Sequence, residues 1–128
     1  MTMKDPRGEI TIQTLAMPKD TNFDGNIFGG WIVSHMDIAA GIVAKRVAGG
    51  KKVVTVSIHS MNFIKPVHVA DVVSCYVKLL KVGNTSITMW VEVWVKKPRL
   101  NEEYKVTEGE FIFVAVDAMG KPVPVQSI

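Results

Sequence analysis

The chain lacks the features that mark secreted, membrane-spanning and nucleic-acid-binding proteins. Its single cysteine, Cys75, allows no internal disulfide, so we expect a protein of the reducing cytoplasm with this cysteine as a buried packing residue. No apolar run reaches the roughly 18 residues that predict a transmembrane helix, and residues 1–9 lack the apolar segment of a signal peptide. The net charge is only +3, and the basic residues occur in small groups that suit an anionic small molecule better than a nucleic-acid duplex.

The sequence also lacks the common motifs of metal, nucleotide and serine-hydrolase sites. His35, His59 and His68 do not fall at metal-ligand spacing with one another or with Cys75, so no metal site is expected. No serine stands in a Gly-x-Ser-x-Gly turn, and neither a Walker phosphate loop nor a dinucleotide fingerprint is present. Any chemistry in this chain must therefore come from other residues.

What the chain does have is enough apolar sequence for one folded core. Hydrophobic residues make up 48% of its 128 residues, which predicts a single domain with loose ends at residues 1–8 and 119–128. An almost entirely apolar stretch at residues 30–48, followed by Gly49 and Gly50, predicts one long helix. Strands are predicted at residues 10–15, 52–63, 71–82, 85–97 and 104–117.

This pattern indicates an α+β protein with one curved antiparallel sheet around one apolar helix. The four strands after the helix follow one another through short turns, which favours antiparallel pairing. In residues 85–97 the odd positions from Ile87 to Val95 are apolar, and we expect Trp90 and Trp94 on the opposite face to stay exposed unless the chain associates. In residues 52–63 the alternation places Val54, Val56 and Ile58 on one face, and Thr55, Ser57 and His59 on the other.

The most unusual residue of the predicted helix is Asp37. It is the only acidic residue between Asp24 and Asp71, and most of its helical neighbours are apolar. A buried carboxylate without a partner is costly or shifts its pKa, so either the fold compensates Asp37 or the chain keeps it for chemistry. We therefore interpret Asp37 as a candidate general base, or as a nucleophile towards an acyl group.

The start of the predicted helix supplies further candidate groups. Gly29 and Gly30 allow close backbone approach, and the free amides of a first helical turn can bind a phosphate or a developing oxyanion. Asp37 follows Gly30 by about two helical turns, so both can face the same side. Asn22 and Asn26 in the preceding loop could bind a water or a carbonyl, although loop asparagines more often form turns.

Several motifs together give the chain a resemblance to a known family. In chain order they are Asn22-x-x-Gly-x-Ile-Phe-Gly-Gly-Trp, Met36-Asp37, Val54-Thr-Val, Met61-Asn-Phe-Ile-Lys-Pro, Ala70-Asp71-Val72-Val73, Lys81-Val-Gly-x-x-Ser86 and Val91-Glu-Val-Trp-Val-Lys-Lys97. Over about residues 11–118 the chain resembles the hotdog-fold acyl-CoA thioesterases, and within them the bacterial YciA-like group.

The resemblance implies a hotdog fold, with a curved sheet of five to six antiparallel strands around a central helix, a dimer as the active unit and a hexameric assembly. It implies hydrolysis of acyl-CoA to a carboxylic acid and CoA, with no cofactor because the substrate brings the CoA. By this resemblance Asp37 is the base or nucleophile, the amide of Gly30 polarises the thioester carbonyl, and Asn22 comes from the facing subunit. The residues implied at the CoA or acyl group are Asn26, Gly29, Met61, Phe63, Lys81, Gly83, Ser86, Lys96 and Lys97.

Two other functions stay open at this point. A hotdog dehydratase or hydratase would rely on a catalytic histidine paired with a carboxylate. However, His35 stands two positions before Asp37 and therefore lies on a different helix face. A non-catalytic acyl-CoA-binding module would need no ionisable group at Asp37.

Overall fold

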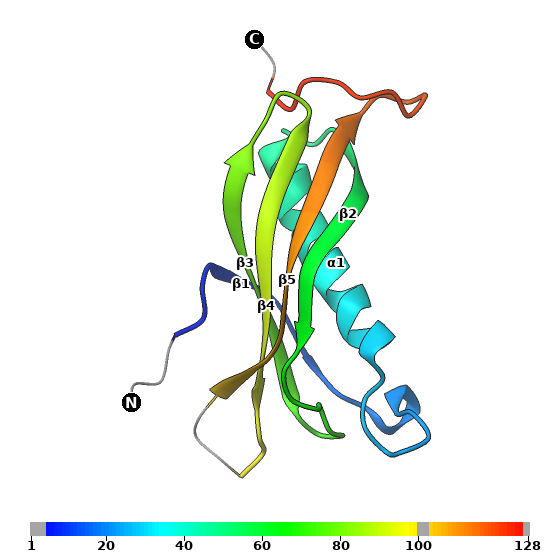
Figure 1. The fold of residues 1–128 in the computed structure, drawn as a ribbon, viewed down its shortest axis with the longest axis vertical. Helices are drawn as coiled ribbons and strands as arrows, with labels where there is room; N and C mark the ends of the chain where they lie inside the picture. The colour runs from blue at the N-terminus through cyan, green and yellow to red at the C-terminus, as the bar shows by residue number, and fades with distance from the viewer. Residues whose placement is uncertain (1–4, 100–102, 127–128) are drawn as a thin grey trace.

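The computed structural model describes residues 5–99 and 103–126, and within them one helix packs against one sheet (Figure 1). The helix α1 spans Gly29–Val47, and a short 3-10 helix, η1, spans Pro18–Asp20. The strands are β1 (Glu9–Leu15), β2 (Lys52–Phe63), β3 (Val72–Val82), β4 (Ser86–Lys96) and β5 (Glu103–Val116). They form one five-stranded sheet in the order β1-β3-β4-β5-β2, and every neighbouring pair is antiparallel. The predicted elements are therefore confirmed to within one residue at most ends.

The core lies between α1 and the inner face of the sheet, as the period-two pattern of β4 predicts. The odd positions of β4 from Ile87 to Val95 are fully buried, and Phe111, Phe113 and Ala115 of β5 are buried beside them. Register pairs Met89 with Phe111, so these side chains share a face. The strands bend along their length and follow the helix, which lies across one face of the sheet (Figure 1).

The helix is buried on one side only, although its apolar sequence suggested burial all round. Six residues face the sheet at helical spacing: Ile32, Met36, Ala39, Ala40, Val43 and Ala44. On the other side, Ile38 is 53% exposed and Ile42 is 47% exposed. The helix ends as predicted, because Gly49 and Gly50 both adopt positive φ angles that favour glycine.

Strand β2 departs from the predicted alternation because it contains two register shifts. Thr55 lies opposite Phe113 and Ser57 lies opposite Ile112, so one extra residue, Val56, is inserted between them. Thr55 therefore faces the helix with Phe113, whereas Ser57 faces away, and the expectation that they share a face is wrong. A second shift falls between His59 and Asn62, where Ser60 has a φ of 54°.

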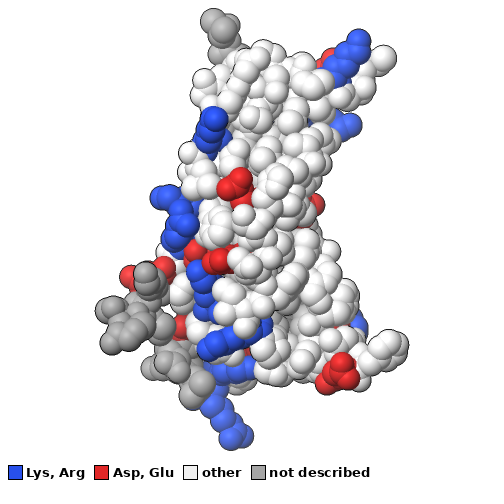
Figure 2. All heavy atoms as spheres, in the orientation of Figure 1, with Lys and Arg blue, Asp and Glu red and all other residues white. Residues whose placement is uncertain are grey.

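Strand β2 is also an edge strand with an apolar surface. It pairs only with β5, and Val56 and Ile58 are 53% and 40% exposed. Figure 2 shows the face of the sheet that points away from α1, where Lys and Arg side chains follow the side formed by β3 and β4. The side formed by β2 and α1 is almost free of charge (Figure 2). An uncharged edge with exposed apolar side chains is a surface that association would cover.

The outer face of the sheet is better covered than the sequence suggested. Trp94 is only 4% exposed and Trp90 is half-buried, so the expectation of exposed tryptophans is wrong for Trp94. The segment 5–8 lies against this face: the amide of Arg7 donates to Glu92 Oε1 at 3.2 Å, and its guanidinium lies 5.4 Å from the centre of the Trp90 ring. Residues 5–8 are therefore attached to the sheet and not loose, while residues 1–4 lie outside the described residues.

The C-terminal segment is likewise attached over most of its length. Val125 is 1% exposed, and its amide donates to the carbonyl of Asn84 at 2.8 Å. The amide of Val123 donates to the carbonyl of Ala115 at 2.9 Å. The expectation of a loose end from residue 119 is thus wrong for the described part of the tail, and residues 127–128 lie outside the described residues.

Candidate active site

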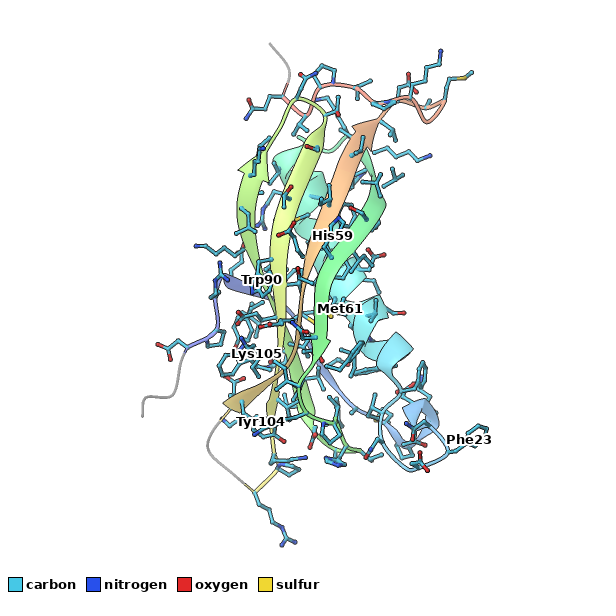
Figure 3. All side chains as sticks on the ribbon, in the orientation of Figure 1. Phe23, His59, Met61, Trp90, Tyr104 and Lys105 are labelled. Carbon is cyan, nitrogen blue, oxygen red and sulfur yellow. The ribbon has the colours of Figure 1, made fainter. Side chains whose placement is uncertain are left out.

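The loop before α1 is held by the side chain of Asn22. Its Oδ1 accepts hydrogen bonds from the amides of Asp24, at 2.9 Å, and of Asn26, at 3.1 Å. This is the turn-forming role that asparagine has in many loops. At the outer end of the loop Phe23 points away from the rest of the chain and is fully exposed (Figure 3).

The loop leads into a helix start with free amide donors. Phe28 is the N-cap and has no side-chain hydrogen bond to offer, while the amide of Trp31 donates to the Phe28 carbonyl at 3.1 Å. Within residues 5–99 and 103–126, the amides of Gly29 and Gly30 have no hydrogen-bond partner. Two unpaired donors therefore lie at the positive end of the helix dipole, where they can hold an anion or an oxyanion.

A cavity of about 350 Å³ opens beside this helix start. Its inner wall is apolar, whereas asparagine and lysine side chains stand at its polar part. Ten residues line it: Asn22, Asn26, Ile27, Gly29, Ile32, Phe63, Ile64, Lys65, Pro66 and Val67. Of the predicted site residues, the structure thus brings Asn22, Asn26, Gly29 and Phe63 together around one hollow. Gly30, Met61 and Asp37 are not among the lining residues.

Asp37 lies further along α1 and has one fixed and one free carboxylate oxygen. Its Oδ1 accepts a hydrogen bond from the Thr55 hydroxyl at 2.7 Å. No partner of Oδ2 is found in the described part of the chain. The residue is half-buried, so the expectation of a fully buried acid without a partner is wrong. Its partial exposure and the hydrogen bond from the Thr55 hydroxyl compensate the carboxylate. A carboxylate held in this way keeps one oxygen available to a water or a substrate.

His35 does not pair with Asp37. Its Nδ1 lies 2.9 Å from the carbonyl of Trp31, and its ring stacks on the Trp31 ring at a centroid distance of 4.1 Å. Since a carbonyl oxygen only accepts, Nδ1 carries the proton of this bond. The histidine is therefore bound to its own helix, and the pairing that a dehydratase would use is missing between these two residues.

The residues predicted at CoA fall into two groups at opposite ends of the sheet. Lys81, Gly83 and Ser86 lie at the turn between β3 and β4, where the Gly83 amide donates to the Ser86 carbonyl at 2.8 Å. Lys96, which is exposed, ends β4 at the other end. At about 3.3 Å per residue, the two ends of β4 are roughly 30 Å apart. The two groups of one chain therefore cannot both contact the same phosphate.

The Lys97 side chain is mostly buried and forms an ion pair within the chain. Its Nζ lies 2.9 Å and 3.0 Å from the two carboxylate oxygens of Asp71, and 2.8 Å from Nδ1 of His68. Burial acts to lower the pKa of Lys97, but hydrogen bonds and charge from Asp71 and Tyr104 outweigh it and raise the pKa above its ordinary value. Asp71 itself is 1% exposed.

Two buried carboxylates, Asp71 and Glu92, escaped the sequence interpretation. Glu92 stands at a position that the alternation of β4 assigned to the outer face, but it is 2% exposed. It accepts hydrogen bonds from the indole nitrogens of Trp90, at 2.8 Å, and Trp94, at 2.9 Å. The signal was the spacing itself, because residues two positions on either side of Glu92 in a strand share its face and both are tryptophan.

Cys75 is confirmed as a buried packing residue, because burial raises the pKa of its thiol to about 12. The described residues contain no group of three or more His, Cys, Asp and Glu side chains placed to hold a metal ion. Among the helices of the described chain, none has both the length and the apolar character needed to cross a membrane.

Comparisons with known proteins agree on one family. The family model of the thioesterase superfamily matches residues 24–102. The chain is 53% identical over 129 aligned residues to the acyl-CoA thioester hydrolase YciA of Salmonella typhimurium, covering 97% of this chain and 96% of that one. It is similar to the crystal structure of a hexameric thioesterase from Yersinia pestis, with 50% identity, a TM-score of 0.91 and coverage of 95% and 99% of the two chains. A hexameric hotdog fold thioesterase of Campylobacter jejuni is 40% identical with a TM-score of 0.86, covering 93% of this chain and 91% of its own.

A single long helix on a five-stranded antiparallel sheet is the arrangement of the hotdog fold. The chain belongs to the thioesterase superfamily.

Proposed function

We propose that the chain hydrolyses acyl-CoA to a free carboxylic acid and CoA, with Asp37 as the reacting carboxylate. The observation that carries this proposal is the state of Asp37, whose Oδ1 is fixed by Thr55 while Oδ2 has no partner among the described residues. In a binding module nothing would require an ionisable group there. The name of the Salmonella relative supports acyl-CoA as the substrate class.

The reaction follows from these groups. A water attacks the thioester carbonyl carbon while Asp37 takes a proton from it, and the carbonyl oxygen becomes an oxyanion that accepts a hydrogen bond from the Gly30 amide. The carbon–sulfur bond then breaks, the CoA sulfur takes up the proton, and the acid is released. In the alternative route Asp37 attacks the carbon itself and expels the CoA sulfur as a thiolate, giving a mixed anhydride; water then hydrolyses this anhydride to the free acid, regenerates the Asp37 carboxylate and supplies the proton that the thiolate takes up. Neither route requires a metal or a redox cofactor.

We propose that each site is built from two copies of the chain. Gly30 and Asp37 are seven residues apart on one helix, which separates them by about 10 Å. The carbon and oxygen of a carbonyl are only about 1.2 Å apart, so a thioester held at the Gly30 amide of one helix lies well away from Asp37 of the same helix unless a water spans most of the gap. The amide of one copy and the carboxylate of another can both reach one thioester, and in the same arrangement Asn22 reaches the site from the facing subunit.

The surface of the chain supports this association. The exposed side of α1, with Ile38 and Ile42, adjoins the apolar edge strand β2, with Val56 and Ile58. A two-fold axis across α1 would bury this surface and would bring the β3–β4 turn of one copy to the helix start of the other. Lys81, Gly83 and Ser86 of one copy would then lie at the cavity of its partner. The relatives from Yersinia and Campylobacter are hexameric, and we propose a hexamer built from three such pairs here.

The decisive experiment measures release of the free CoA thiol from acyl-CoAs of short to long chain, by the wild type and by Asp37→Asn in parallel. We expect turnover by the wild type and a loss of at least about 100-fold in kcat for the variant, since a general base typically contributes 10²–10⁴-fold. Absence of release from every substrate, with CoA binding retained, would overturn the proposal in favour of a binding module.

A single-turnover measurement separates the two roles of Asp37. If the carboxylate attacks directly, mass spectrometry of the quenched intact protein will show an acyl adduct that Asp37→Asn does not form. If Asp37 activates a water, the wild type will hydrolyse its substrate with no adduct.

A further inference from the structure

Asp71 is a buried carboxylate that forms a cluster with His68 and Lys97. The cluster adjoins Val67, which lines the cavity, and it has no part in the reaction proposed above. We propose that the Asp71–Lys97 ion pair is a positioning device: it fastens the two loops that form the cavity wall, residues 22–28 and 64–71. Lys97 then acts on the substrate through these loops and not by direct contact with a CoA phosphate. This inference rests on the proposed function, since it takes the cavity as the place where the acyl thioester binds.

The ammonium group of Lys97 has no donor left for a phosphate. A lysine offers three N–H donors. They meet the two carboxylate oxygens of Asp71 at 2.9 Å and 3.0 Å, and Nδ1 of His68 at 2.8 Å. The side chain is also only 25% exposed. Because all three of its donors have partners within the chain, Lys97 is held in place by internal hydrogen bonds.

The carboxylate of Asp71 in turn fixes the loop that ends at it. Its Oδ2 accepts the amide of His68 at 2.9 Å, and the Asp71 amide donates back to the His68 carbonyl at 3.1 Å. These two bonds close a tight turn in which Ala70 adopts a φ of 76°, a conformation that a non-glycine residue adopts only when its surroundings impose it. The end of the loop is also joined to Ala16, which exchanges two backbone hydrogen bonds with Ala70 and Asp71.

The turn is connected to the cavity through one backbone hydrogen bond. Val67 precedes His68, is fully buried, and its carbonyl accepts the amide of Ile27 at 2.8 Å. Both Val67 and Ile27 line the cavity, and Ile27 lies two residues before Gly29. Movement of the turn at His68 would therefore pass through Val67 and Ile27 to the helix start, where the free amides lie.

Without Lys97, the buried Asp71 carboxylate would lose its cation and keep only the hydrogen bond from the His68 amide, and the turn would have to open to hydrate it. The test uses Lys97→Met, the conservative Lys97→Arg, and the double variant Asp71→Asn/Lys97→Met, which replaces the ion pair by a neutral pair. Arg46→Gln is the matched control, because Arg46 also pairs with a carboxylate, that of Glu9, but on the exposed surface. All are compared as the assembled protein.

The first measurement is hydrogen exchange of the peptides that cover residues 22–28 and 64–71. We expect faster exchange in both segments for Lys97→Met, recovery in Lys97→Arg, and no change in Arg46→Gln. Unchanged exchange in Lys97→Met would overturn the proposal. This measurement needs no turnover, so it decides the role of the ion pair even if the wild type fails to hydrolyse acyl-CoA, a failure that would count against the proposed function alone.

The second measurement compares an acyl-CoA with the matching acyl-pantetheine thioester, which lacks the nucleotide and its phosphates. We expect Lys97→Met to lower kcat/KM by about 10- to 100-fold for both thioesters alike, because the cavity wall is displaced. A loss for acyl-CoA alone would identify Lys97 as a direct phosphate contact and overturn the proposal. If Lys97→Met does not fold, the double variant carries both comparisons: we expect smaller effects of the same sign, because the bond between position 97 and the turn is missing while no charge is left buried, and unchanged exchange or a loss for acyl-CoA alone would overturn the proposal.

Discussion

Glu92 gives the sharpest test of how the outer face of the sheet is held together. One carboxylate oxygen accepts from Trp90 Nε1 at 2.8 Å, and the other accepts from Trp94 Nε1 at 2.9 Å and from the Arg7 amide at 3.2 Å. Every partner of these oxygens is a donor. In addition, the ammonium group of Lys105 lies 3.8 Å from Oε2. We predict that Glu92→Gln is not a conservative change, because it keeps the shape but turns one of the two acceptors into a second donor.

The expected loss can be estimated from these contacts. A hydrogen bond to a charged group contributes about 1.5–3 kcal/mol, and the side-chain amide of glutamine would face an N–H donor that has no room to find another acceptor. We expect the free energy of unfolding to fall by about 2–4 kcal/mol, which for a chain of this size lowers Tm by roughly 8–15 °C. Truncation to alanine would leave all three donors unpaired and should cost more.

The assay is thermal unfolding followed by tryptophan fluorescence, at one fixed protein concentration because assembly contributes to Tm. Glu110→Gln is the matched control: Glu110 lies opposite Trp90 on the same face, and no hydrogen bond of its carboxylate is found among the described residues. It should change the unfolding free energy by no more than about 0.5 kcal/mol. If Glu92→Gln and Glu110→Gln have the same Tm, the carboxylate of Glu92 does not hold this face and the reasoning fails.

Three further changes have outcomes set by single contacts. Thr107→Val should raise the free energy of unfolding by about 1–2 kcal/mol in a denaturant titration, because the buried Thr107 hydroxyl finds no hydrogen-bond partner among the described residues; a lower stability would mean that it has one. Cys75 should resist iodoacetamide at pH 8 until the protein is unfolded, because its raised pKa of about 12 leaves almost no thiolate; modification of the native protein, seen by mass, would contradict this. Gly30→Ala should keep or raise Tm, since its Cβ would lie at an ordinary 3.5 Å from Phe28, and it keeps the backbone amide, but the added methyl group would obstruct the approach of a thioester to that amide and should lower kcat/KM by about 10-fold or more. Full activity of that variant would remove Gly30 from the site.

The fold could be predicted from the periodicity of apolar residues because this periodicity reflects which side chains are buried. The odd positions of β4, from Ile87 to Val95, are apolar because they face α1, and the even positions differ because they do not. The same argument applies to Phe111 and Phe113 in β5. Secondary structure could therefore be predicted almost to the residue wherever one face of an element is buried by its own chain.

Periodicity failed where the backbone itself departs from it. The insertion at Val56 reverses the face of every residue before it relative to those after it, and nothing in the residues 52–63 marks the position. The sequence pattern also cannot predict burial by segments that are distant in the chain. Glu92 is buried partly by Arg7, which is 85 positions away. The pairing of Lys97 with Asp71 likewise depends on two strand ends meeting in space, so a lysine in a family motif was assigned to the ligand when the fold itself uses it.

The insertion in β2 also connects Asp37, the carboxylate proposed to react, to the surface that we propose for association. With regular alternation, Thr55 would point away from α1 with Ser57, and Asp37 would lose its hydroxyl donor. The extra residue itself, Val56, has a side chain that is 53% exposed on the free edge of the sheet. A bulge on an edge strand ordinarily discourages pairing with another chain. Here it orients Thr55 towards Asp37 and presents an apolar side chain beside the exposed face of the helix. The proposed site, built from the amide of one helix and the carboxylate of another, would use both effects at once, because the extra residue in β2 serves the carboxylate within the chain and the contact between chains.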